Sequence, residues 1–170
     1  MKKPDPGTVD QLRRDKALRE QVLELLRGGS AHLDFNKAVA GLPAKLRGAK
    51  PAGQPHTPWR LVEHMRIAQW DILEFCRDPK HVSPKWPDGY WPPDPAPPDG
   101  QAWTRTLRSF RADLKAMQKL VADPAADLLA PIPGGQGQTL LREAMVVADH
   151  TAYHLVQLVI IRRLLGAWSE

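Results

Sequence analysis

Apolar residues recur at steps of three and four along most of the chain, a spacing that predicts helices. The first helix is expected over 9–27 and ends at the stop signal Gly28–Gly29. Its apolar stripe consists of Leu12, Leu18, Val22, Leu25 and Leu26. A short second helix over 31–41, capped by Ser30, follows. Its apolar set is Leu33, Phe35, Ala38, Val39 and Leu42.

Three longer helices follow. One is expected over 57–76, because Thr57 suits the N-cap and Pro58 the first helical position. Its apolar stripe is Leu61, Met65, Ala68, Ile72 and Phe75. Another helix is expected over 101–122, with Trp103, Leu107, Phe110, Leu114, Met117 and Val121 as its stripe. The last runs over 139–165 and is apolar around most of its circumference, so it is expected to be buried.

No stretch has the alternating pattern of a strand, so the chain is predicted to be an all-α helical bundle with long crossover loops. Its 170 residues suit one domain, 1–170, in which 1–8 are expected to be a flexible tail. The loop over 79–100 holds eight of the seventeen prolines. Trp86, Tyr90 and Trp91 lie within it, so an ordered cover over the bundle is favoured and a substrate-pocket wall is the alternative.

The net charge of +5 raises the possibility of nucleic-acid binding, since one helix face carries Arg105, Arg108, Arg111, Lys115 and Lys119. No aromatic residues are interleaved with this stripe, so a solvated outer face is the better interpretation and no nucleic-acid partner is expected. The single cysteine suits a reducing compartment. The N-terminus lacks the apolar run of a signal peptide, and the run over 155–161 is too short to span a membrane. A cytoplasmic protein without a membrane partner is expected.

Three histidines carry the candidate chemistry. His150 and His154 lie one turn apart on the last helix, inside a stripe that otherwise packs, and His64 lies at the edge of the apolar arc of the 57–76 helix. Imidazoles at i and i+4 point the same way and can share a metal ion. Three histidine ligands would leave coordination positions open, as in catalytic sites. From the spacing alone, core histidines satisfied by hydrogen bonds are the more common alternative.

Other polar residues near the histidines are given structural interpretations first. Asp71 and Glu143 can orient an imidazole or act as a base, but ion pairs are favoured for both. Tyr153 is expected to pack, and Asp149 points away from the histidine stripe. Cys76 continues an apolar arc and is expected to be a buried, inert thiol. The histidines expected at the surface are His32, His56 and His81, and for His56 and His81 a place near the mouth of the site is the alternative.

Two segments give the chain a resemblance to a known family: "PWRLVEH", which ends in His64, and "DHTAYHLVQ", which contains His150 and His154. In this order they resemble the DinB family of metalloenzymes, over roughly 55–168. Members often show H-x-x-Y-H-x-G-Q, and Val156 stands here at the glycine position. Tyr153 and Gln157 match the pattern.

The resemblance implies a four-helix up-down-down-up bundle, usually a homodimer. It also implies a divalent metal ion, most often zinc or nickel, bound by His64, His150 and His154. The implied function is an enzyme acting on a small molecule, either an S-transferase using a low-molecular-weight thiol such as bacillithiol or mycothiol, or a hydrolase. The sequence does not choose between a thiolate and a water as the activated group. The alternative is a non-catalytic metal-binding, stress-related interaction protein.

Overall fold

The structure, a computed structural model, describes residues 6–168. Its helices are α1 (Pro6–Arg27), α2 (Phe35–Val39), α3 (Pro58–Arg77), α4 (Ala102–Ala122) and α5 (Leu140–Leu164). Two short 3-10 turns, η1 (Ala44–Leu46) and η2 (Asp88–Tyr90), lie in the connections. Among the described residues no strand forms, and one isolated β-bridge joins Pro131 to Thr139. The predicted all-α bundle is confirmed.

The two helices that carry the histidines begin where their capping residues predict. The Thr57 side chain accepts a hydrogen bond from the backbone N–H of Arg60, and Pro58 opens α3. Thr139 caps α5 in the same way, by accepting from the N–H of Arg142. Each threonine satisfies one of the amide groups that a helix N-terminus leaves without an intrahelical acceptor.

The expectation for the short helix needs correction. It does not begin after Ser30 but at Phe35, where the Asp34 carboxylate accepts from the N–H of Lys37 at 2.9 Å. Asp34 provides the capping oxygen that Ser30 was expected to supply. Of the tail expected over 1–8, residues 6–8 lie at the start of α1, and residues 1–5 lie outside the described part of the chain.

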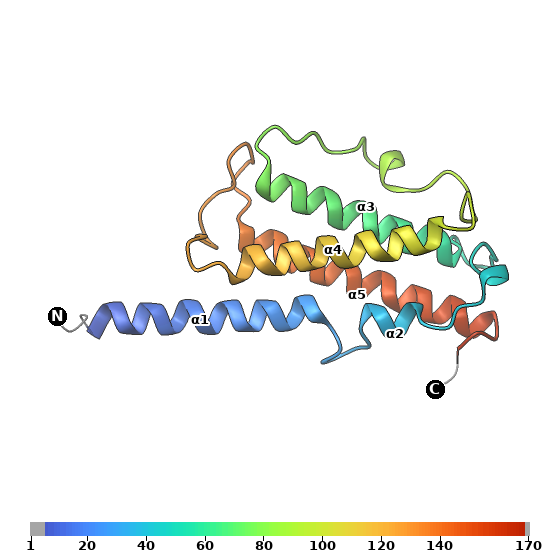
Figure 1. The fold of residues 1–170 in the computed structure, drawn as a ribbon, viewed down its shortest axis with the longest axis horizontal. Helices are drawn as coiled ribbons and strands as arrows, with labels where there is room; N and C mark the ends of the chain where they lie inside the picture. The colour runs from blue at the N-terminus through green and yellow to red at the C-terminus, as the bar shows by residue number, and fades with distance from the viewer. Residues whose placement is uncertain (1–5, 169–170) are drawn as a thin grey trace.

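The chain runs along α1 and α5 in one direction and along α3 and α4 in the other (Figure 1). Helices α4 and α5 each contact both α1 and α3, so α1 and α3 lie on opposite sides of the bundle. The first turns of α1 extend beyond the other helices (Figure 1). Leu12 is therefore 64% exposed, and Leu25, on the same predicted stripe, is exposed as well.

Two apolar clusters form the core, one at each end of the bundle. The first joins α2 to the N-terminal half of α3, the N-terminal half of α4 and the C-terminal half of α5. The second joins the C-terminal halves of α1, α3 and α4 to the first half of α5. On α5, Val147 belongs to the second cluster and Leu155 to the first. The two histidines of α5 lie at the junction between them.

Helix α5 is buried on the predicted histidine stripe but not around most of its circumference. One face stays exposed, along Met145, Tyr153, Val156, Ile160 and Leu164. By length and hydropathy alone α5 would qualify as a membrane span, a test that core helices of soluble proteins also pass. Here α5 packs against all four other helices.

The long loop between α3 and α4 returns along α3 (Figure 1). The Thr57 hydroxyl donates to the carbonyl of Pro95 at 2.6 Å, and the Tyr90 hydroxyl donates to the Asp71 carboxylate. Gly48 approaches the same loop so closely that an added Cβ would lie 2.5 Å from the Cβ of Ala96. These contacts hold the loop against the bundle as an ordered cover.

Candidate metal centre

The structure brings the three predicted histidines together. His64 extends from α3, and His150 and His154 extend from successive turns of α5. The Nε2 atom of His64 lies 3.1 Å from Nε2 of His154 and 3.0 Å from Nε2 of His150. Together the three side chains form a group with ligand atoms within 4.8 Å of one another. Residues 86 to 90 positions apart in sequence thus meet at one point.

The outer hydrogen bonds of two imidazoles decide where their lone pairs lie. Nδ1 of His64 is 2.9 Å from the carbonyl oxygen of Tyr90, which can only accept, so this nitrogen carries the proton. Nδ1 of His154 is 2.8 Å from Oε1 of Gln157, and the same assignment follows. Both Nε2 atoms therefore present lone pairs to each other. Two acceptors cannot hydrogen-bond, so a cation between them is the arrangement that satisfies both.

The donor set fits a divalent transition-metal ion. Bonds from zinc to imidazole nitrogen are about 2.0–2.1 Å long, so ligands of one ion can lie about 3 Å apart. The Nε2 separations of 3.0 and 3.1 Å agree with this. Imidazole suits zinc, copper, iron and nickel alike. His64, His150 and His154 are the residues that would hold the ion.

Burial keeps the imidazoles neutral at pH 7. Desolvation lowers the pKa of His64 to about 4, against the opposing effect of its hydrogen bond to Tyr90. The pKa of His150 falls to about 3, mainly through desolvation and also through its proximity to the other two imidazoles. Desolvation lowers the pKa of His154 as well. Neutral imidazole is the form that binds metal.

The proline-rich loop covers the histidines with an aromatic stack. The ring of Trp91 lies parallel to that of His64, with centroids 3.8 Å apart. His56 stacks on Trp91 in turn, at 4.1 Å. His56 is half-buried, and its pKa is lowered by burial and by Arg60, so the expectation of a surface histidine is wrong. The expected covering role of the loop is confirmed.

Asp71 anchors this loop instead of contacting a ligand imidazole. Its carboxylate accepts from Nε2 of His81 at 2.7 Å and from the hydroxyl of Tyr90. Burial and this contact raise the pKa of Tyr90 to about 12. The His81 side chain is only 9% exposed, so its predicted surface position is also wrong. Asp71 thus positions the residue whose carbonyl oxygen contacts His64.

Four other polar or aromatic residues were assigned positions from the sequence, and three of them lie as expected. Glu143 forms the expected ion pair, with Arg142, and is buried. His32 and Asp149 are exposed, as expected. Tyr153 does not pack in the core: it is 63% exposed, with its ring edge-on to His154.

Sequence reasoning missed three residues that hold the ligand imidazoles. Gln157 was recoverable, because it lies three residues after His154, and such pairs are neighbours on a helix. Tyr90 acts through its backbone carbonyl and Trp91 through ring stacking. Both depend on the path of a loop that has no periodic pattern, so no sequence signal identified them.

A pocket adjoins the histidines between α3, α5 and the loop; we call it the histidine groove. Its volume is about 320 Å³. The lining residues are His64, Ala68, Asp71, Ile72, Phe75, Ser83, Trp86, Tyr90, Gln138, Arg142, Glu143, Val146 and His150. Two of the three histidines therefore face a space that can hold a small molecule. The loop forms both a cover and a pocket wall.

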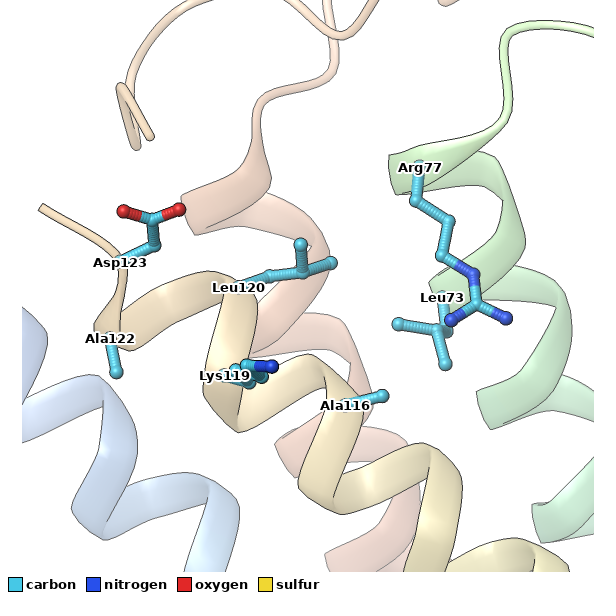
Figure 2. Close-up of a pocket in the computed structure, with 7 residues that line it drawn as sticks. All are labelled: Leu73, Arg77, Ala116, Lys119, Leu120, Ala122 and Asp123. Atoms are coloured by element: carbon cyan, nitrogen blue, oxygen red, sulfur yellow. The ribbon is translucent and has the colours of Figure 1, made fainter. Parts of the chain in front are cut away.

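A larger hollow, of about 520 Å³, lies between the C-terminal ends of α3 and α4 (Figure 2). Arg77 extends from α3 at its edge, and Lys119 and Leu120 extend from α4 (Figure 2). The Arg77 guanidinium is paired with Glu74, and none of the lining residues is a histidine. The candidate chemistry therefore belongs to the histidine groove, despite its smaller volume.

Cys76 is expected to react slowly with thiol reagents. Burial, with a smaller contribution from Glu143, raises the pKa of its thiol to about 12 from 9.0. At any pH below 9, the thiolate fraction of Cys76 in the folded protein is therefore about 1000-fold smaller than in the unfolded protein. Labelling by DTNB at pH 8 should be at least about 100-fold slower in the native than in the urea-unfolded protein. Because the folded pKa exceeds the unfolded one, the free energy of unfolding should fall as the pH rises from 9 towards 12. Equal labelling rates would contradict this.

Comparison with known proteins agrees with the geometry. The family model of the DinB superfamily matches residues 30–158, a range that includes all three histidines. The match begins earlier than the sequence resemblance, so the short helix α2 belongs to it. No curated protein and no solved structure matches this chain. Since the family model covers well over half of the sequence, the chain belongs to the DinB superfamily.

Proposed function

We propose that this protein is a metal-dependent enzyme that acts on a small molecule, as an S-transferase using a low-molecular-weight thiol or as a hydrolase. The observation that carries the proposal is the convergence of three neutral imidazoles beside a pocket. His64, His150 and His154 would hold a divalent ion, zinc or nickel, which would supply the Lewis acidity that lowers the pKa of a thiol or water.

The chain's own residues prepare the site in ways that support the proposal. Tyr90 and Gln157 orient two imidazoles with their lone pairs inward. Trp91 excludes water from one face of His64. The groove beside His150 receives the substrate. Cys76, half-buried and protonated, suits a reducing compartment, so the proposal assigns the enzyme to the cytoplasm.

The test compares metal-loaded with metal-free protein in two assays. Metal-dependent conjugation of a thiol, such as bacillithiol, to monochlorobimane would support the transferase. Metal-dependent release of nitrophenol from p-nitrophenyl acetate would support the hydrolase. Full metal occupancy without either activity would favour the alternative, a non-catalytic metal-binding interaction protein. Absence of metal binding would overturn both.

We also propose that the protein forms a homodimer through the exposed face of α5. This face carries the exposed residues Met145, Tyr153, Val156, Ile160 and Leu164. If two α5 helices pair about a two-fold axis near Val156, these residues of the two copies lie against one another. The pairing covers an apolar face that a monomer leaves in contact with water.

A charge placed on this apolar face is expected to change the oligomeric state. Val156→Glu and Ile160→Glu should each weaken the dimer, because each puts a carboxylate into an apolar contact. Val82→Glu, on the exposed loop, is the control and should leave the dimer unchanged, as measured by sedimentation equilibrium. A monomeric wild-type protein would refute the proposal, and a dimer that is insensitive to both α5 variants would locate the interface elsewhere.

A further inference from the structure

Three hydrogen-bond acceptors of the histidine groove already have donors. Asp71 accepts from His81 and Tyr90. Glu143 is paired with Arg142. Gln138 accepts from the backbone N–H of Gln136 through its Oε1, at 2.6 Å. Because these acceptors are already occupied, they cannot accept new hydrogen bonds from a ligand. A polar group of a ligand placed beside them would lose its hydrogen bonds to water without replacement.

The surface between these polar groups is apolar. Ala68, Ile72 and Phe75 contribute from α3, and Val146 contributes from α5, one turn before His150. On α3 the lining residues run from His64 to Phe75, eleven residues apart, which is about 16 Å along a helix. The groove, with a volume of about 320 Å³, therefore extends along α3 for about three turns.

The end of the groove away from the histidines is formed by Phe75 and Gln138. The turn before α5 comes so near these two residues that an added Cβ on Gly135 would lie 3.0 Å from the Phe75 ring and 2.9 Å from Oε1 of Gln138. In the same turn, Gly134 lies against the carbonyl of Pro79. This close packing holds Phe75 and Gln138 in place at that end of the groove.

We propose that the ligand of this groove is an amphiphile: a head group that binds metal at the histidines, followed by an unbranched apolar tail along Ile72, Val146 and Phe75. An extended chain advances about 1.2 Å per bond, so about 16 Å corresponds to about thirteen bonds, of which the head group takes about three and the tail about ten. This inference rests on the proposed metal-dependent function and specifies its substrate class. A strongly hydrophilic thiol would then act as a co-substrate, not as the occupant of the groove.

The test measures the binding of 1-alkanethiols with two to twelve carbons to the zinc-loaded protein. Tryptophan fluorescence reports the binding and gives a Kd for each thiol. Zinc content and binding of ethanethiol are measured first, and a failure at that step refutes the proposed function itself. With both in place, Kd is expected to fall about twofold to fourfold per added methylene. The gain should stop near ten carbons, where the tail reaches beyond Phe75. A Kd independent of chain length would overturn the amphiphile proposal while leaving the metal function intact.

A charge inside the groove should remove the chain-length dependence. Val146→Glu places a carboxylate beside the tail, so octanethiol should lose most of its advantage over ethanethiol. Val82→Glu is the matched control, because Val82 is 84% exposed on the loop and does not line the groove. If Val146→Glu still binds octanethiol more tightly than ethanethiol by the wild-type factor, the assignment of the tail path would be overturned. Should that variant misfold, the wild-type series still decides.

Discussion

Replacing His154 by alanine is expected to abolish stoichiometric metal binding. The wild-type protein, purified untagged and without chelator, should contain about one divalent ion per chain. His154 supplies one of three imidazoles, and its Nε2 faces that of His64 at 3.1 Å. Loss of one ligand removes about 3 kcal/mol or more of binding free energy, so affinity should fall at least about 100-fold. Elemental analysis and competition with a chromophoric chelator measure both quantities.

The matched control is His32→Ala, which removes an exposed histidine away from the centre. Its metal content should equal that of the wild type. Gln157→Leu should be intermediate, with affinity about 10–100-fold weaker, because it removes the acceptor that orients His154 without removing a ligand. If wild type and His154→Ala take up no metal even on reconstitution, the histidines are core residues and the enzyme proposal fails.

Replacing Arg19 by methionine should lower the free energy of unfolding by about 3 kcal/mol. The guanidinium donates to the carbonyl oxygens of Val121, Asp123 and Ala126, at 2.7 to 2.9 Å, and to the Asp15 carboxylate. These carbonyls lie at and just beyond the C-terminus of α4, where a helix leaves acceptors without donors. Methionine preserves the apolar stem but leaves those acceptors unpaired.

The control is Arg13→Met on the same helix, since Arg13 is exposed. Surface charges of this kind contribute little, and its unfolding free energy should change by less than about 0.5 kcal/mol. Urea denaturation of the metal-free proteins measures both, because metal binding would add its own stabilisation. Equal midpoints for the two variants would show that the Arg19 contacts contribute no more than exposed ones.

Individual helices were predictable because their signals are local. Thr57 and Pro58 mark the start of α3, and Thr139 marks that of α5, through hydrogen bonds that span only three residues. The apolar stripe of α4 likewise follows from spacing alone. Spacing did not reveal that α1 extends past its neighbours, which leaves Leu12 exposed. Burial depends on what packs against a face, and that is a property of the whole bundle.

By itself, the sequence determined the helix-rich fold, the i, i+4 pair His150–His154 and, through resemblance, their association with His64. Only the tertiary structure decided how the imidazoles are held. It brings Tyr90 and Trp91 against His64 and ties the loop to Asp71. It also turned His56 and His81 inward, and Tyr153 outward. The reason is physical: helix formation and capping act within a few residues, whereas the lone-pair direction of an imidazole depends on contacts between segments far apart in the chain.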